Sequence, residues 1–260
     1  MNKTALITGS SNGIGYELAR VHAEKGDDLV LVARNIFKLN ELKIELEEKH
    51  KINVYTIEKD LSVPWAAREV YDELKKQNII IDYLENNAGF GDYGLFAESD
   101  WNRQEQMINL NVMTLVHLTW LFLPDMIGRK SGKIMNVAST ASFQPGPTMS
   151  VYFATKAFVL SFSEAINNEV AEHGITVTAL CPGATHSGFQ AAASLQDSRV
   201  FEGNDFPNSR EVAEYGYQAM MRGKAVAIHG LKNAILANAV RLAPRSLVVK
   251  MARKVQAKKY

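Results

Sequence analysis

The sequence has very little cysteine and no recurrent metal-ligand spacing, and both absences narrow the possible functions. A single cysteine, Cys181, among 260 residues excludes a framework of disulfides and a zinc site built on several cysteines. The six histidines are scattered over different predicted elements, so we expect no metal site. No stretch rich in Pro, Gly and Ser interrupts the chain before residue 230, and there is no internal repeat that would indicate an array of small units.

An excess of charge and a long apolar run are also missing. The 29 Lys and Arg residues against 28 Asp and Glu give a net charge of +1, so the overall charge does not indicate a nucleic-acid partner. The longest apolar stretch, around residues 113–124, contains His117 and is shorter than the roughly 20 residues of a membrane-spanning helix. The apolar residues before Gly9 are too few for a signal peptide, and we therefore expect a cytoplasmic protein.

The balanced total conceals an uneven distribution of charge. From Tyr215 to the end there are ten basic residues and no acidic one, whereas the preceding 214 residues carry a formal charge near −9. After Pro244, apolar residues fall on one face of a predicted helix and basic residues largely on the other. This tail, residues 231–260, either docks on the acidic body of this chain or of a dimer partner, or lies on an anionic membrane surface. We favour docking on the protein.

Apolar runs of strand length alternate with segments of helical periodicity. Strands are predicted at residues 4–8, 29–32, 52–57, 79–84, 133–138 and 175–180. Helices are predicted at residues 14–25, 37–50, 64–77, 99–123 (ended by Pro124) and 151–172, with a last helix–strand pair at about 210–228. Strands that are apolar throughout and separated by helices indicate a parallel sheet covered on both faces. The sequence therefore predicts one doubly wound α/β domain over residues 1–230.

A glycine-rich turn joins the first predicted strand to the first predicted helix. Residues 8–15 read TGSSNGIG, a spacing of T-G-x-x-x-G-x-G rather than G-x-G-x-x-G. Glycines here permit a tight turn and let phosphate oxygens approach backbone N–H groups at the positive end of a helix. Such a turn also occurs as a plain connection in α/β proteins. Its place at the first strand–helix junction nevertheless favours dinucleotide binding by a Rossmann-type sheet.

The end of the second strand indicates which dinucleotide is bound. NAD-binding folds usually place an acidic residue here to bind the ribose 2′-hydroxyl. In this sequence Val32 is followed by Ala, Arg34 and Asn, with no acidic residue before Glu41. A guanidinium suits a 2′-phosphate through bidentate hydrogen bonds, so Arg34 favours NADP, although it could also be a solvated loop residue.

A tyrosine, a lysine and a serine form the candidate catalytic group. Tyr152 and Lys156 share one face of a predicted helix, and Ser139 follows the fifth strand at the carboxyl edge of the sheet, where ligands bind. A nearby ammonium and a nicotinamide cation would lower the pKa of a tyrosine below its usual value of about 10. Tyr152 could then exchange a proton with a carbonyl oxygen near neutral pH. Ser139 lacks the G-x-S-x-G surroundings of a hydrolase nucleophile.

Over roughly residues 1–230 the chain resembles the short-chain dehydrogenase/reductase family. The matching motifs, in order, are TGSSNGIG at 8–15, NNAG at 86–89, the Asn of NLNV at 111, the Ser of NVAS at 139, YFATK at 152–156 and PG at 182–183. Within the family, the chain is similar to NADP-preferring oxidoreductases of poorly defined substrate. The resemblance implies an NADP(H)-dependent oxidoreductase that interconverts a carbonyl and an alcohol. The alternative is a nucleotide-binding sensor or scaffold that keeps the pocket without turnover.

The resemblance also implies a role for each motif. Tyr152 would be the general acid/base, and Lys156 would hold the nicotinamide ribose and lower the tyrosine pKa. Ser139 would bind the substrate carbonyl, and Asn111 would hold a water of the proton relay. The implied cofactor-binding residues are Gly9, Ser11, Asn12, Gly13, Ile14, Gly15, Arg34, Asp60, Leu61, Asn87, Ala88, Gly89, Tyr152, Lys156, Pro182, Gly183 and Thr185. The family commonly forms homodimers or homotetramers through the helices that correspond here to residues 99–123 and 151–172.

The sequence departs from the family pattern at Glu85 and Asn12, and its loops indicate the kind of substrate. Glu85 occupies a usually apolar strand position, so it either lies at a solvated strand end or has a buried partner. Asn12 stands where some NADP-preferring members have Lys or Arg, which leaves Arg34 to bear the preference alone. Residues 184–208 are the expected lid over the substrate. Loop residues that indicate an apolar ketone or aldehyde as substrate, unless they pack for structural reasons, are Phe90, Phe143, Met149 and Phe189.

Overall fold

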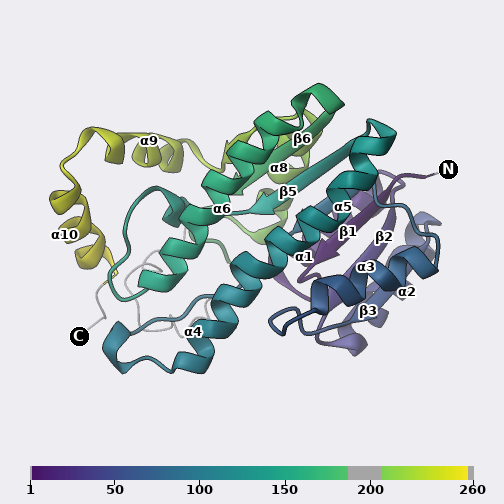
Figure 1. The fold of residues 1–260 in the computed structure, drawn as a ribbon, viewed down its shortest axis with the longest axis horizontal. Helices are drawn as coiled ribbons and strands as arrows, with labels where there is room; N and C mark the ends of the chain where they lie inside the picture. Colours follow the sequence, from purple (N-terminus) through teal and green to yellow (C-terminus); the bar gives the residue numbers. More distant parts are fainter. Residues whose placement is uncertain (1, 187–205, 257–260) are drawn as a thin grey trace.

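Seven parallel strands form a single sheet in the computed structural model, which describes residues 2–186 and 206–256. The strands are β1 (Thr4–Thr8), β2 (Asp28–Ala33), β3 (Val54–Glu58), β4 (Tyr83–Asn86), β5 (Gly132–Val137), β6 (Ile175–Cys181) and β7 (Val226–Ile228). Their order, β3-β2-β1-β4-β5-β6-β7, places the chain reversal between β1 and β4 (Figure 1). The predicted doubly wound α/β sheet is confirmed.

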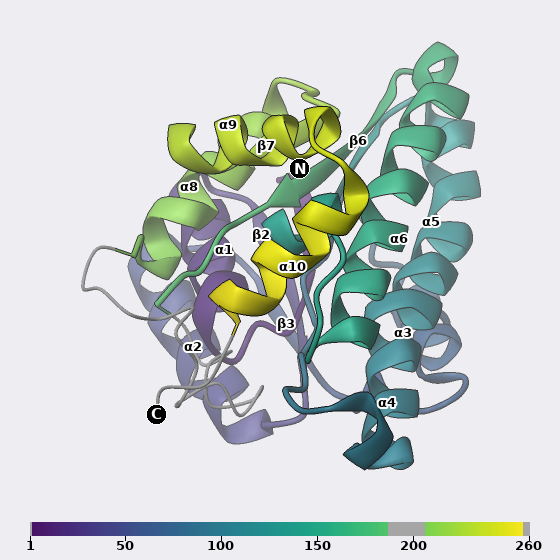
Figure 2. The same ribbon diagram turned by 90° about the vertical axis from the view of Figure 1, so that its left-hand side faces the viewer.

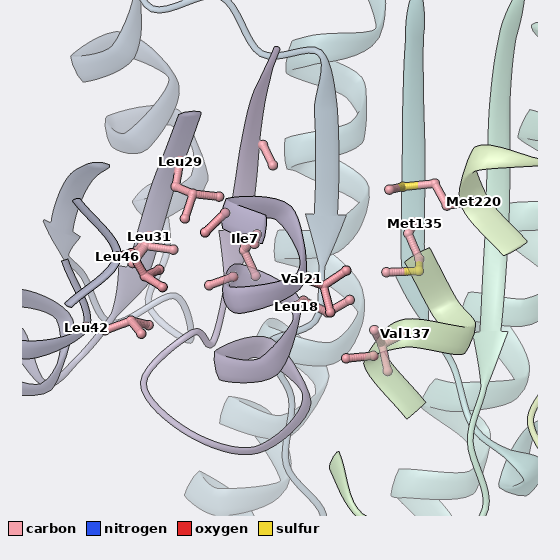
Figure 3. Packing of buried hydrophobic residues seen from close by; sticks show 14 of the residues in the cluster. Ile7, Leu18, Val21, Leu29, Leu31, Leu42, Leu46, Met135, Val137 and Met220 are labelled. Atoms are coloured by element: carbon pink, nitrogen blue, oxygen red, sulfur yellow. The ribbon is translucent and has the colours of Figure 1, made fainter. Parts of the chain in front are cut away.

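Two layers of helices enclose the sheet, one on each face (Figure 2). One layer consists of α1 (Gly13–Glu24), α2 (Ile36–His50) and α8 (Ser209–Met221), and the other of α3 (Ala66–Lys76), α5 (Leu115–Arg129) and α6 (Ser150–Glu169). Successive strand residues point to opposite faces, so Ile7 packs under α1 whereas Leu6 packs on the α3–α5 side. Figure 3 shows the cluster beneath α1, α2 and α8, in which Leu18 and Val21 contact the sheet.

Two predicted boundaries are wrong for local reasons. The strand predicted at residues 79–84 begins only at Tyr83, because the N–H of Ile79 bonds to the carbonyl of Leu74 and closes the end of α3. The helix predicted to begin at Pro64 begins at Ala66, after Trp65, which has a positive φ of 68°. The chain therefore turns sharply at both ends of α3.

The helix predicted at residues 99–123 is longer than expected, and Pro124 does not end it. It runs continuously as α4 (Trp101–Ile108), a π-helical segment (Asn109–Thr114) and α5. Pro124 removes the N–H that would bond to the carbonyl of Trp120, but Trp120 lies on the solvent side, where water can bind that carbonyl. Phe122 and Met126 remain buried against the sheet, and this packing continues the helix past the proline.

The whole helix Trp101–Arg129 is long and apolar enough, by length and composition, to cross a membrane. The apolar stretch around residues 113–124, which the sequence predicted to be too short to span a membrane, thus lies within a longer helix. Nearly half of its most apolar window, 44%, is buried inside the protein. Leu118 and Phe122 on that buried side belong to the core between the sheet and α3, as in the core helix of a globular domain.

Glu85 has a buried partner, His22, which settles the choice between a solvated strand end and a buried contact. The Nε2 atom of His22 lies 3.0 Å from a carboxylate oxygen of Glu85, and its Nδ1 atom lies 2.7 Å from Asp27. Burial of the ring lowers the pKa of His22, but the carboxylates of Glu85 and Asp27 outweigh this effect and raise it to about 9. At neutral pH His22 is thus a buried cation that ties α1 to β4.

This cluster predicts a specific loss of stability in alkali. Because the pKa of His22 is raised from 6.5 to about 9, its contribution is fully present below pH 6.5 and is lost as the pH rises through 9. We expect the free energy of unfolding, measured with urea at pH 6.5 and 9.5, to fall by roughly 2 kcal/mol from this group. The double variant His22→Leu/Glu85→Leu, which replaces the ion pair with two apolar side chains, should lack this fall. An equal fall in both proteins contradicts the assignment.

Candidate active site

A cavity of about 960 Å³ extends along the carboxyl edge of the sheet. Its wall is made by the loops that follow β1, β2, β3, β4, β5 and β6, together with residues of α6 and of the C-terminal helices. In a doubly wound sheet this edge, at the chain reversal, is where ligands bind. Nearly all the residues singled out in the sequence line this one cavity, although they come from separate loops and helices along the chain.

The glycine turn is shaped for an anionic ligand. Gly9 and Gly13 have positive φ angles of 69° and 58°. A Cβ atom on Gly9 would lie 2.9 Å from the Cα of Ala88, and one on Gly15 would clash with the side chain of Asn87. No side chain caps the N-terminus of α1, since Asn12 precedes it without a side-chain bond, so the first N–H groups of α1 can bind a ligand. The turn therefore fits the pyrophosphate of a dinucleotide.

Thr8 holds the glycine turn against the NNAG segment. Its hydroxyl oxygen accepts hydrogen bonds from the N–H groups of Asn87 (2.9 Å) and Ala88 (3.0 Å). The Asn87 amide in turn donates to the carbonyl of Thr8 over 2.8 Å. Thr8 was not among the predicted site residues, and its place at the end of β1, before Gly9, was the available signal. Asn87 lines the cavity and, through this hydrogen bond, also holds the glycine turn in its conformation.

Three predicted residues gather at the end of the cleft beyond β2 and β3. Arg34 is exposed on the cavity wall near Asp60, whose carboxylate accepts hydrogen bonds from the backbone and hydroxyl of Ser62. Burial raises the pKa of Asp60, but the Ser62 bonds and the Arg34 charge outweigh it and hold this pKa below its usual value. Leu61 is buried beneath the same wall. Arg34 is not alone, because Lys38 lines the cavity one helical turn further on.

Tyr152, Ser139 and Lys156 meet on the floor of the cavity. A hydrogen bond joins the side chains of Tyr152 and Ser139, and Ser139 also accepts the N–H of Ala141 over 3.0 Å. The Nζ of Lys156 donates to the carbonyl of Val137 over 2.7 Å and lies 5.9 Å from the centre of the Tyr152 ring. Burial lowers the pKa of Lys156 to about 8. Tyr152, Lys156 and Ser139 are thus adjacent, as the sequence predicts.

The predicted lowering of the Tyr152 pKa requires a nicotinamide cation next to the hydroxyl, and it stays a prediction. Burial raises the pKa of Tyr152 to about 12, and the hydrogen bond with Ser139 offsets this only in part. Tyr152 is accordingly a protonated hydroxyl at neutral pH.

Asn111 lies beside the cavity rather than on its wall. It sits in the π-helical segment, where its amide donates to the carbonyl of Phe90 (3.0 Å) and to the hydroxyl of Thr155 (3.1 Å). Its carbonyl oxygen accepts the N–H of Phe90, and a Cβ on Gly89 would lie 2.9 Å from that oxygen. The structure therefore places Asn111 as a residue that positions the loop after β4 and α6. Thr155 was missed by the sequence analysis.

The PG segment after β6 contacts the C-terminal part of the chain. Pro182, Gly183 and Thr185 line the cavity, and the Thr185 hydroxyl donates to the carbonyl of Gly183 over 3.0 Å. A Cβ on Gly183 would lie 2.5 Å from the side chain of Asn233, in α9 (Leu231–Ala239). Most of the predicted lid, residues 187–205 including Phe189, lies outside the described residues.

The end of the cavity beside Tyr152 has several apolar lining residues, with one correction to the predicted lining. Phe90 and Met149 line the cavity as predicted, together with Phe153. Phe143 does not, because it packs against the cluster around Val159, in which α6 and the start of α5 meet β6 and β7. The remaining wall comes from α9 and α10 (Arg245–Val255), so residues 231–256 pack onto the body of the chain instead of forming a separate tail.

Comparisons with known proteins identify the family of this chain. The family model described as short chain dehydrogenase matches residues 3–198. The very-long-chain 3-oxoacyl-CoA reductase of Homo sapiens is 33% identical over 188 residues, which cover 70% of this chain and 59% of that relative. The chain thus matches less than two thirds of the length of that relative.

Two solved structures match nearly the whole chain. A short-chain dehydrogenase from Sphingobium yanoikuyae in complex with NADPH is 32% identical, with a TM-score of 0.84 and 99% of both chains covered. The bulky-bulky ketone specific alcohol dehydrogenase from Comamonas testosteroni is 29% identical, with a TM-score of 0.79 and 92% of both chains covered. Together with the ordered motifs on one sheet edge, these matches show that the chain belongs to the short-chain dehydrogenase/reductase family of nicotinamide-dependent oxidoreductases.

Proposed function

We propose that this protein is an NADP(H)-dependent oxidoreductase that interconverts an apolar ketone or aldehyde and its alcohol. The observation that carries the proposal is the meeting of the Tyr152 and Ser139 hydroxyls at the apolar end of a cavity whose other end carries Arg34. A solved structure that is 32% identical over 99% of this chain contains NADPH, which supports the choice of cofactor. The names of the relatives, a 3-oxoacyl-CoA reductase and a bulky-ketone alcohol dehydrogenase, support a carbonyl substrate with a large apolar part.

In this proposal the protein residues orient the carbonyl and move one proton. The nicotinamide, when bound, supplies or accepts a hydride at the carbonyl carbon. The hydroxyls of Ser139 and Tyr152 donate hydrogen bonds to the carbonyl oxygen and so stabilise the charge that develops on it. Because burial keeps Tyr152 protonated, its hydroxyl can transfer a proton to that oxygen during reduction. Lys156, held by the carbonyl of Val137, lies close enough to stabilise the resulting phenolate.

The experiment that tests the proposal is a turnover assay. The purified protein is mixed with NADPH or NADH and a panel of alkyl, aryl and polar ketones and aldehydes, and cofactor oxidation is followed by absorbance. We expect turnover with NADPH that is faster on apolar than on polar carbonyls. Tight NADPH binding without turnover of any carbonyl would favour the sensor or scaffold alternative. Faster turnover with NADH would overturn the choice of NADP.

We also propose a homo-oligomer held together through the outer faces of α5 and α6. Trp120 of α5 is 61% exposed and Phe158 of α6 is 44% exposed, so these helices present large apolar side chains to solvent. We expect light scattering to give at least twice the 28.9 kDa of one chain, and the variant Trp120→Glu/Phe158→Glu to be monomeric. The matched control is Phe37→Glu, on α2 in the opposite helix layer, which should leave the mass unchanged. A monomeric native protein contradicts this proposal.

A further inference from the structure

The C-terminal helix α10 crosses the front of the substrate cavity. Figure 2 shows α10 in front of the other elements, between the α1–α8 side and α6. Four of its residues, Val248, Met251, Ala252 and Val255, line the same cavity as Tyr152. The helix is therefore part of the candidate active site, although it lies about a hundred residues after the catalytic tyrosine.

The two faces of α10 differ in chemistry. The basic residues Lys250, Arg253 and Lys254 are exposed and point away from the cavity-lining face. On the cavity side, Met251 and Val255 are each 60% exposed even though they line the cavity. Much of their apolar surface is thus exposed to solvent on the face of α10 that lines the cavity. An apolar group in the cavity would bury this surface.

The C-terminal end of α10 is attached to the body of the protein. At its C-terminal end Gln256 is buried, and its backbone carbonyl accepts a hydrogen bond from the hydroxyl of Tyr93 over 2.7 Å. The Gln256 side chain accepts a second bond, from the hydroxyl of Thr148 over 3.3 Å. Toward its N-terminal end, Val248 is buried and lines the cavity.

These attachments set the width of the cavity. Tyr93 lies three residues after Phe90, and Thr148 immediately precedes Met149, and both Phe90 and Met149 line the cavity. The hydrogen bonds to Gln256 therefore connect α10 to the loops that carry the facing apolar wall. Their loss would let α10 move relative to Phe90 and Met149.

We propose that α10 is the substrate-selecting wall of this enzyme, with Met251 and Val255 binding a large apolar substituent of the ketone and Gln256 fixing the distance to the facing wall. The inference rests on the proposed function. It adds which residues bind the part of the substrate that the catalytic residues do not contact. Each methylene of the substituent that becomes buried should improve kcat/KM roughly threefold to fourfold. A ketone with only small substituents leaves Met251 and Val255 uncovered and gains nothing from α10.

The test compares one small and one large ketone, butan-2-one and 1-phenylhexan-1-one, with NADPH. We expect Met251→Ala/Val255→Ala to raise KM for the large ketone roughly tenfold, with kcat nearly unchanged, and to leave butan-2-one within twofold. Met251→Trp, which narrows the cavity at this wall, should lower kcat/KM for the large ketone at least tenfold and also spare the small one. The matched control is Lys250→Ala, on the outward face of the same helix, which should change neither substrate.

The attachment of α10 is tested separately. Tyr93→Phe removes the hydroxyl that bonds to Gln256, and we expect it to reduce the preference for the large ketone while the NADPH dissociation constant stays the same. Its control is Tyr71→Phe, which removes a hydroxyl that bonds to Asp125 on the α3–α5 side of the sheet.

The outcomes separate this inference from the proposed function. If no ketone is turned over, the proposed function fails, and calorimetric binding of 1-phenylhexan-1-one to the complex with NADP+ still tests the wall. Binding that Met251→Trp abolishes and Lys250→Ala preserves supports the wall in that case, whereas equal binding by both variants overturns it. If turnover occurs, the inference is overturned when Met251→Ala/Val255→Ala changes kcat/KM equally for the two ketones. It is also overturned when Lys250→Ala changes kcat/KM for the large ketone as much as Met251→Ala/Val255→Ala does.

Discussion

Replacing Tyr152 with phenylalanine is expected to lower kcat for NADPH-dependent ketone reduction by about 10² to 10⁴-fold. The substitution removes only the hydroxyl that hydrogen-bonds to Ser139 and faces the cavity, and the ring keeps its packing against Phe153. The carbonyl oxygen then loses both a hydrogen bond in the transition state and its proton donor. Stopped-flow or steady-state kinetics measure kcat, and a fluorescence titration measures the NADPH dissociation constant, which should change little.

The control for this variant is Tyr55→Phe, which removes a hydroxyl that bonds to Glu73. It should leave kcat within twofold. A Tyr152→Phe protein that keeps the native rate would show that another group supplies the proton.

The raised pKa of Tyr152 also predicts how the two directions of the reaction depend on pH. Oxidation of the alcohol needs the phenolate, so kcat for oxidation should rise as the pH rises above neutrality, whereas kcat for ketone reduction should not.

Replacing Arg34 with alanine is expected to raise the NADPH dissociation constant by about 10- to 150-fold, or roughly 1.5–3 kcal/mol, with little change for NADH. The guanidinium is exposed at the end of β2 on the cavity wall, where it can form charge-assisted hydrogen bonds with a 2′-phosphate. NADH carries no such phosphate, so its binding should be insensitive. Isothermal titration calorimetry with both cofactors measures the two dissociation constants directly.

Lys38 extends this prediction to a second cation. It lies on the same wall, so Lys38→Ala should weaken NADPH binding by a smaller factor than Arg34→Ala. The matched control is Lys43→Ala, further along the same helix, where the lysine pairs with Glu47 and does not line the cavity. Native protein that binds NADH more tightly than NADPH would refute the role of both cations.

The sequence by itself determined the architecture and the location of the site, because both depend on local patterns. The run TALIT is buried on both faces of the sheet and is observed as β1, Thr4–Thr8, with the bounds that its composition predicts. Glycines at positions 9 and 13 predict a turn whose backbone conformation would be strained for other residues, and both have a positive φ in the structure. The order of the motifs then placed Ser139, Tyr152 and Lys156 at one sheet edge, since parallel strands all end on the same side.

Other properties depend on which segments far apart in the sequence come together, and only the tertiary structure decided them. The helix continues through Pro124 because packing of Phe122 and Met126 outweighs one lost hydrogen bond. Glu85 is acceptable in a central strand because His22, 63 residues earlier, reaches it from α1. Burial raises the pKa of Tyr152, and how deeply this side chain is buried depends on the whole cavity wall.

The basic tail is the clearest case of this division. Its amphipathic pattern indicated an apolar face that needs a partner, but periodicity records only that a face is apolar and not what lies opposite. The structure places that face, through Val248 and Met251, on the cavity that also contains Tyr152. The position depends on the hydrogen bonds of Gln256 to Tyr93 and Thr148, which join residues more than a hundred positions apart. Contacts over such separations follow from how the chain is folded in three dimensions, and no local pattern encodes them.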